Sequence, residues 1–279
     1  MAGTNPSLSL IVAVYNAAPY LEFIFEVLGR QSFRNFEVIV ADDGSGPEVR
    51  QVVDRVRDDF TFPLQHLWQE DAGFRKNVML NKSINAAKSD YLVFIDGDCV
   101  PHRHFLNDHW LHREPNTVLC GRRMNLSKQL TGKLTIESVR TGDYERLSPS
   151  VWWDGLMARS SNLEDAIRIE NPFVRKILHR NQARILGCNF SVEKKLLEAV
   201  NGFNEEYHAP GIGEDTDIAF RLNLIGARFT TLRYLAILFH LFHPPTQVGA
   251  ENKRIFDEVV WKGNPLCRNG LRKLEVTTD

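Results

Sequence analysis

The chain has 279 residues, and 43% of them are hydrophobic, which is enough to bury a large core as one domain or as two closely packed halves. Its 34 lysine and arginine residues nearly balance its 35 aspartate and glutamate residues. This balance excludes an overall electrostatic attraction to nucleic acid or acidic membranes, so we expect no nucleic-acid partner and a local site for any anionic ligand.

Four cysteines are dispersed along the chain without a C-x-x-C pair, which argues against a zinc ribbon and against a secreted disulfide framework. The first residues lack the features of a signal peptide, and no apolar run is long enough to span a bilayer. We therefore expect a cytoplasmic protein. These patterns leave open its oligomeric state and a peripheral association with the inner face of the cytoplasmic membrane.

Strands and helices alternate in the first hundred residues. The predicted strands are 8–14, 36–41, 64–68 and 91–96, and the predicted helices are 19–30, a segment that begins at Pro47, and 74–87. This alternation indicates parallel βαβ units with right-handed crossovers. Residues 1–100 are therefore predicted to form a Rossmann-like, nucleotide-binding half of an α/β fold.

The pattern loosens beyond Pro101. Predicted helices are 105–112, 193–200, 215–224 and 251–261, and predicted strands are 118–124, 185–192 and one or two within 229–240. The long segment through Trp152 and Trp153 has no clear period, which is typical of substrate-specific loops. We expect residues 101–279 to form a smaller mixed half that binds metal and acceptor and is continuous with the first half.

Asp96 and Asp98 follow a strand that reads as buried on both faces, and ligands gather at the carboxyl ends of such strands. If the extended backbone continues through Gly97, both carboxylates project to one side, where they can hold Mg²⁺ or Mn²⁺ against phosphates. The alternative is a strand that ends in a polar turn, which Asp and Gly also favour.

Two further loops are expected at the same edge of the sheet. Tyr15 and Asn16 end the first strand, and Asp42 and Asp43 end the second. An aspartate that accepts from a base N–H and a tyrosine that stacks on the base would suit a uridine-like nucleoside. Equally, Asp-Asp-Gly-Ser is a good turn and N-cap sequence, and Tyr15 can be a half-buried aromatic at a strand end.

An acidic pair, Glu214 and Asp215, begins a predicted helix directly after Gly213. The glycine permits close approach to a ligand, and the helix dipole favours the carboxylate form, which can take a proton from a hydroxyl nucleophile. Helix capping is the structural alternative, and it is our interpretation of Asp217. Arg75 and Lys76 also begin a helix, where they can contact a phosphate or base or be solvated.

Two histidines occur near the end of the last predicted strand. His240 follows the strand pattern, whereas His243 precedes a proline and is expected in an extended or turn conformation. In a strand their imidazoles would face opposite ways, so we expect at most one of them, His240 first, to join Asp98 on a metal. Trp152 and Trp153 could stack on a sugar or pack in the core.

The order of these motifs resembles family-2 glycosyltransferases of the GT-A fold over nearly the whole chain. The motifs are Tyr15-Asn16, Asp42-Asp43-Gly-Ser, Asp71-x-Gly-Phe-Arg75, Asp96-Gly-Asp98, Gly187-Cys-Asn189, Gly213-Glu-Asp215 and His240. The central part is similar to bacterial chondroitin polymerase domains and β-1,4-galactosyltransferases. The His-Leu-Phe-His-Pro segment looks like bacterial transferases of surface polysaccharide or lipopolysaccharide assembly.

The resemblance implies an inverting, metal-dependent transfer of sugar from a nucleotide sugar, with UDP favoured, to a glycan or glycolipid hydroxyl. It implies that Asp43, with Asp42, Tyr15 and Asn16, holds the base; that Asp98, Asp96 and His240 bind Mn²⁺ or Mg²⁺ and the diphosphate; and that Asp215 is the base, with Glu214 orienting the acceptor. Gly187, Asn189 and Gly213 would line the sugar pocket.

One position departs from the family pattern. Many relatives carry an Arg-Asn pair in the helix after the third strand, where this chain has Leu80-Asn81, and we expect Arg75 to replace that arginine. Two other functions stay open at this point, a sugar-nucleotide nucleotidyltransferase and an inactive glycan-binding scaffold. The nucleotidyltransferase normally shows a glycine-rich phosphate loop near the first strand, and residues 13–17 contain no glycine.

Overall fold

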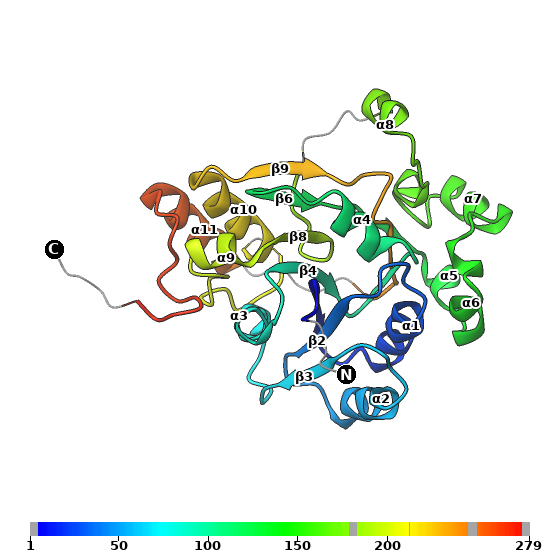
Figure 1. Ribbon diagram of the computed structural model, residues 1–279, viewed down its shortest axis with the longest axis horizontal. Coiled ribbons are helices and arrows are strands. Elements are labelled where there is room, and N and C mark those ends of the chain that lie inside the picture. The colour runs from blue at the N-terminus through cyan, green and yellow to red at the C-terminus, as the bar shows by residue number, and fades with distance from the viewer. Residues whose placement is uncertain (1–4, 179–182, 212, 245–249, 275–279) are drawn as a thin grey trace.

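The computed structural model describes residues 5–178, 183–211, 213–244 and 250–274. Its centre is a seven-stranded sheet in the order β3-β2-β1-β4-β8-β6-β9 (Figure 1). These strands are β3 (Leu64–Trp68), β2 (Phe36–Asp42), β1 (Leu8–Val14), β4 (Tyr91–Asp96), β8 (Phe190–Glu193), β6 (Thr117–Cys120) and β9 (Arg228–Thr231). The sheet therefore takes strands from both predicted halves of the chain.

The first four strands are parallel, as their pattern predicts, and β8 runs antiparallel to both β4 and β6. The three connecting helices are α1 (Ala18–Leu28), α2 (Pro47–Arg57) and α3 (Lys76–Ala86). Because side chains alternate along a strand, Leu10 and Val12 face a core cluster with α1, whereas Ile11 faces a second cluster with α3. Helices on both faces thus leave the carboxyl ends of these strands free.

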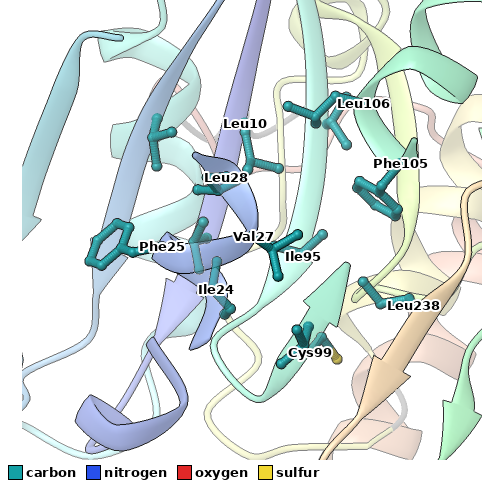
Figure 2. Packing of buried hydrophobic residues seen from close by; sticks show 14 of the residues in the cluster. Leu10, Ile24, Phe25, Val27, Leu28, Ile95, Cys99, Phe105, Leu106 and Leu238 are labelled. Carbon is teal, nitrogen blue, oxygen red and sulfur yellow. The ribbon is translucent and has the colours of Figure 1, made fainter. Parts of the chain in front are cut away.

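The cluster on the α1 face extends to a second, smaller sheet. Figure 2 shows Ile24, Val27 and Leu28 of α1 in the same cluster as Cys99 and Leu238. The small sheet has the order β5-β10-β7, with β5 (Cys99–Pro101), β10 (Leu238–His240) and β7 (Met124–Asn125). In this sheet His240 pairs with Cys99, so the end of β10 is fixed next to Asp98.

Helices supply the rest of the second half (Figure 1). They are α4 (Phe105–Leu111), α5 (Lys128–Thr131), α6 (Ile136–Thr141), α7 (Pro149–Leu156), α8 (Pro172–Leu178), α9 (Lys194–Ala199), α10 (Glu214–Leu224) and α11 (Ala250–Lys262), with two 3₁₀ turns at Asp143–Glu145 and Leu163–Ala166. None of the described helices combines the length and apolar character that crossing a bilayer requires.

Two predicted boundaries were wrong. The predicted strand 118–124 ends at Cys120 and the chain re-forms a strand at Met124, in the other sheet. The break falls at Gly121, where a Cβ would lie only 2.0 Å from the side chain of Asn189. The predicted strand 185–192 begins only at Phe190. The segment expected to be irregular holds four short helices, one of them begun by a capping box at Thr135.

Candidate functional site

A cavity of about 560 Å³ lies at the carboxyl ends of β1, β2 and β4. Eight of the residues singled out from the sequence line it, from segments as far apart as β1 and the loop after β10. They are Tyr15, Asp43, Asp96, Gly97, Asp98, Glu214, His240 and His243. Lys76 and Arg123 line it as well. Strand ends and helix starts therefore converge on one site, as expected for an α/β sheet.

Asp98, His240 and His243 form a compact cluster at one end of this cavity. The Asp98 carboxylate lies 3.5 Å from Nε2 of His240 and 3.2 Å from Nε2 of His243. The two Nε2 atoms are themselves 3.2 Å apart. One ligand atom from each residue lies within 4.8 Å of the others, so the three side chains can hold one metal ion.

The convergence of both imidazoles corrects one expectation. The sequence placed them on opposite faces of a strand, but β10 ends at His240 and the chain leaves the strand before His243. A second expectation also fails, because residues 97 and 98 form a turn between β4 and β5 rather than extended backbone. Asp96 and Asp98 consequently have different partners, and only Asp98 belongs to the histidine cluster.

The cluster fits a divalent cation by its chemistry. Burial alone would raise the pKa of Asp98, but hydrogen bonds from His240 and His243 hold it well below its usual range. The hydrogen bond to Asp98 in turn raises the pKa of His243 to about 9. An ionised carboxylate with two imidazoles is a mixed set of oxygen and nitrogen ligands that a divalent cation can use.

Lys76 joins two more acidic groups of the cavity, Asp96 and Glu214. Its Nζ lies 2.7 Å from Oδ1 of Asp96 and 2.9 Å from Oε1 of Glu214, which belong to β4 and α10. Burial would lower the pKa of Lys76, but the two carboxylates raise it well above its ordinary value. Burial raises the pKa of Glu214, and Lys76 opposes that shift. The lysine is therefore a charged bridge between the aspartate that ends β4 and the start of α10.

The two carboxylate oxygens of Glu214 have different surroundings. Its Oε2 is buried and has no hydrogen-bond partner among the described residues. Gly187 lies directly against the other oxygen, because a Cβ at Gly187 would be 3.0 Å from Oε1 of Glu214. The backbone N–H of Gly187 donates to Oδ2 of Asp215 over 3.4 Å, and Asp215 lies beside the cavity rather than in its described lining.

Glycine is required where α10 begins. Gly213 has φ of +141°, which L side chains rarely adopt, and a Cβ there would lie 2.3 Å from the ring of Tyr207. Gly213 therefore positions Glu214 through the backbone. Asp217 is structural as expected, although its buried carboxylate pairs with Arg221 at Nε over 2.7 Å instead of accepting a capping hydrogen bond.

Asp43 and Asp42 have separate roles. Asp43 lines the cavity and accepts from Nε2 of Gln69 at 2.5 Å and from the backbone N–H of Arg75 at 2.7 Å. Burial is the main cause that raises the pKa of Asp43. Asp42 is fully buried and is held by the N–H of Ser45 and by His66, each at 2.8 Å. Its expected contact with a base is not supported.

Tyr15 lines the cavity, whereas its neighbour Asn16 has a structural role. Tyr15 lines the cavity with 54% of its surface exposed, and its hydroxyl donates to Asp71 over 3.0 Å. Asn16, with φ of +50°, accepts from Gly46 through its Oδ1 at 3.1 Å and donates its backbone N–H to Ser45. Asn16 thus ties the loop after β1 to the loop after β2.

Two models of known protein families match this chain. The family model described as glycosyl transferase family 2 matches residues 9–152, which is more than half of the chain. The chain belongs to glycosyl transferase family 2. A second family model, described as the N-terminal domain of galactosyltransferase, matches residues 175–244 of this family-2 chain.

Curated relatives of this family-2 chain include two chondroitin synthases. It is 26% identical over 247 residues to the chondroitin synthase of Pasteurella multocida, which covers 82% of the chain and 24% of the relative. It is 25% identical over 252 residues to the chondroitin synthase of Escherichia coli, covering 88% of the chain and 36% of the relative. The chain thus spans about a quarter to a third of the length of these relatives.

Solved structures confirm the GT-A fold. Staphylococcus aureus TarS in complex with UDP matches 92% of this chain and 65% of its own, with a TM-score of 0.60 and 18% identity. The mannosyltransferase PcManGT from Pyrobaculum calidifontis, in complex with GDP-Man and Mn²⁺, matches 91% of this chain and 61% of its own, with a TM-score of 0.56 and 19% identity.

Some residues expected in the site lie elsewhere in the family-2 chain. The amide of Asn189 is fully buried, donates to the backbone oxygens of Arg122 and Ala236, and accepts from His109. It is therefore a structural amide rather than a sugar contact. Trp152 and Trp153 are 51% and 62% exposed on α7, so they are neither core residues nor part of the described lining.

Arg75, the expected substitute for the arginine that many relatives carry at the position of Leu80, is not part of the described lining, and its guanidinium donates to the backbone oxygen of Glu70. The cation beside Asp96 is Lys76, which the sequence placed at a helix start as a candidate contact for a phosphate or base. Arg123, which lines the cavity and donates to Sγ of Cys188 over 3.4 Å, was missed entirely. Its position three residues after the end of β6 is the signal that could have drawn attention to it.

Proposed function

We propose that this family-2 chain transfers a sugar from a UDP-sugar to a hydroxyl of a glycan or glycolipid acceptor, with inversion at the anomeric carbon and with a divalent cation. The pathway we propose is bacterial surface polysaccharide or lipopolysaccharide biosynthesis. One observation carries the proposal: the Asp98, His240 and His243 cluster and the Glu214 carboxylate line the same 560 Å³ cavity. Such a cavity can hold a nucleotide sugar between a cation and a carboxylate.

The nucleoside end of the donor is assigned to Tyr15 and Asp43. The half-exposed ring of Tyr15 can stack on a base, and the Asp43 carboxylate on the same cavity can accept from a base N–H. Support for UDP comes from the neighbours, since TarS has been solved with UDP and with UDP-GlcNAc, whereas PcManGT has been solved with GDP-Man.

The cation is assigned to Asp98, His240 and His243. A divalent cation bound there supplies Lewis-acid stabilisation of negative charge on a diphosphate. Arg123 on the same cavity adds a fixed positive charge. Lys76 offsets one of the two negative charges of Asp96 and Glu214, which reduces the repulsion between these carboxylates and an incoming diphosphate.

Asp215 is assigned as the general base and Glu214 as the residue that orients the acceptor. Glu214 is held by Lys76, which weakens it as a proton acceptor, whereas Asp215 forms no ion pair with any described residue. A base that deprotonates the acceptor hydroxyl opposite the leaving diphosphate produces inversion in one displacement, with no covalent intermediate on the protein.

A donor panel tests the proposal. Nucleotide release is measured from UDP-, GDP- and other nucleotide sugars, with acceptor glycans, before and after chelation of divalent cations. We expect a UDP-sugar to give the fastest release and chelation to lower the rate by about tenfold or more. Release that is equal with and without divalent cations would contradict the metal assignment, and absence of release from every donor would contradict the transfer.

A further inference from the structure

Exposed apolar side chains are concentrated in one short part of the chain. Seventeen large hydrophobic side chains are exposed among the described residues, and eight of them fall within residues 152–178, on and next to α7 and α8. These are Trp152, Trp153, Leu156, Met157, Phe173, Val174, Ile177 and Leu178. We name this set the α7–α8 surface. Exposed apolar groups in such number mark interaction sites, so this segment is a candidate for one.

Helix α8 is the most exposed part of the surface. Phe173 and Ile177, one turn apart, are 70% and 61% exposed, and of the residues of α8 only Arg175 is partly buried. Figure 1 shows α8 at the periphery of the molecule, away from the central sheet. Because its apolar side chains have so little to cover them within the described structure, α8 is suited to an apolar environment outside the chain.

Helix α7 presents its tryptophans outward while its other side is anchored. Val151 and Leu163 pack on the cluster that holds Phe239 of β10, so α7 is fixed to the small sheet. Trp152 and Trp153 remain more than half exposed. Tryptophan combines a large apolar ring with a polar N–H, and it is enriched where a protein meets the headgroup layer of a bilayer.

Three cations of the α7–α8 segment have no carboxylate partner among the described residues, and the one acid of the segment that pairs with no cation, Asp154, is buried. Arg159 and Arg175 donate only to an amide, to backbone oxygens and to a histidine ring, and Lys176 has no carboxylate partner among the described residues. The acidic side chains of the segment are engaged: Asp154 by Ser160, Glu164 and Asp165 by Arg233, and Glu170 by Arg168. The surface therefore offers apolar groups beside uncompensated cations.

We propose that the α7–α8 surface binds the headgroup layer of a lipid bilayer that contains anionic lipids. Exposed Trp, Phe and Ile with lysine and arginine form the combination that such a layer takes up. A second copy of the chain suits this surface less well, because pairing it with itself would bring like charges together. The proposal stands on these side chains alone and does not depend on the chemistry of the cavity.

Vesicle co-sedimentation of the full chain tests the proposal. The probes are vesicles of phosphatidylcholine alone and of phosphatidylcholine with phosphatidylglycerol, at low and high salt. We expect binding to the anionic vesicles that weakens with salt. The variant Lys176→Glu should lower the partition coefficient by about fivefold or more, and the double variant Phe173→Ser/Ile177→Ser should abolish binding.

Trp261→Ser is the matched control, because Trp261 is 84% exposed on α11 and lies outside the α7–α8 surface. Thermal unfolding should be unchanged in all variants, since each alters an exposed side chain. The proposal is overturned if the wild type does not bind anionic vesicles, or if Trp261→Ser loses binding as strongly as the double variant. It is also overturned if analytical ultracentrifugation shows a dimer that only the double variant abolishes.

Discussion

Replacing Lys76 should show whether its bridge to Asp96 and Glu214 positions Glu214 for the reaction or only stabilises the fold. In Lys76→Ala, Glu214 and Asp96 lose their shared cation in a buried site, which costs about 1–3 kcal/mol of unfolding free energy after allowance for partial exposure. Because Lys76 opposes the rise in the pKa of Glu214, its loss raises that pKa further. We expect kcat to fall by about 100-fold and the acidic limb of the rate profile to move to higher pH.

Two variants control this prediction. Lys76→Arg keeps the charge and should restore most of the rate, whereas Lys82→Ala, on the same helix but bonded to Gln69, should change neither the rate nor the pH profile. A uniform loss of rate with an unmoved pH profile in Lys76→Ala would mean that the bridge serves only the fold.

Asp215 and Glu214 should respond differently to loss of charge. Asp215→Asn removes the proposed base and should lower kcat by about 100- to 10,000-fold with little change in KM. Glu214→Gln should raise the KM for the acceptor more than it lowers kcat. Asp215 accepts only two long hydrogen bonds from the described residues, from the backbone N–H of Gly187 and from the hydroxyl of Thr216, and asparagine can keep both, so the unfolding free energy of Asp215→Asn should stay near that of the wild type. A wild-type rate in purified Asp215→Asn removes that residue from its role.

Several single residues could be placed from the sequence, and others could not. Asp43, Asp98 and His240 were predictable because each follows an apolar strand, and strand ends meet at one edge of the sheet. Other motif residues have side chains that hydrogen-bond within the protein and do not line the cavity, namely Asp42, Asn16 and Asn189. No sequence pattern distinguishes a ligand-facing aspartate from a structural one when they are neighbours, since side-chain direction decides it.

At the scale of elements, the start of α10 controls the acidic pair. Gly213→Ala places a Cβ against the ring of Tyr207 and in a backbone conformation that alanine avoids. We expect a loss of about 1–3 kcal/mol in unfolding free energy and a displaced α10 start, so the transfer rate should fall more than stability alone explains. Kinetics at a temperature well below the melting point separates the two effects.

Gly263→Ala is the comparison variant, because Gly263 also has a positive φ, of +59°, but a Cβ at this position would meet no described atom within 4 Å. It should cost stability without affecting the rate. Equal rates for Gly213→Ala and the wild type would show that α10 need not begin at a fixed position.

The elements themselves were largely predictable from periodicity. The four parallel strands and helices α1 to α3 follow apolar spacing closely, because local pattern and burial agree there. The break at Gly121 and the exit from β10 were not predictable, since each depends on a distant side chain or on a switch between two sheets. The end of β10 at His240 lets both histidines reach Asp98, which strand alternation through His243 would not allow.

For the whole molecule, buried histidines predict a loss of stability in mild acid. Burial lowers the pKa of His102 to about 3 and that of His109 to about 4, below the ordinary value of about 6.5. As pH falls below about 6.5, these two histidines become protonated in the unfolded chain but stay neutral in the folded chain. Each histidine should therefore lower the unfolding free energy by about 1 kcal/mol between about pH 7 and about pH 5.5.

Denaturant unfolding at both pH values measures this effect. His109→Gln should show a smaller pH dependence than the wild type, whatever its absolute stability, whereas His208→Gln, at an exposed position, should keep the wild-type dependence. The explanation is wrong if His109→Gln and the wild type lose the same free energy on acidification.

The whole proposed mechanism requires that one cavity hold a nucleotide diphosphate against the Asp98, His240 and His243 cluster. Calorimetric titration with UDP, with and without Mn²⁺, measures this requirement in the wild type and in Asp98→Ala. We expect Mn²⁺ to tighten UDP binding by about tenfold or more in the wild type and to have no effect in Asp98→Ala. UDP affinity that is the same with and without Mn²⁺ in the wild type, or no UDP binding at all, would refute the mechanism.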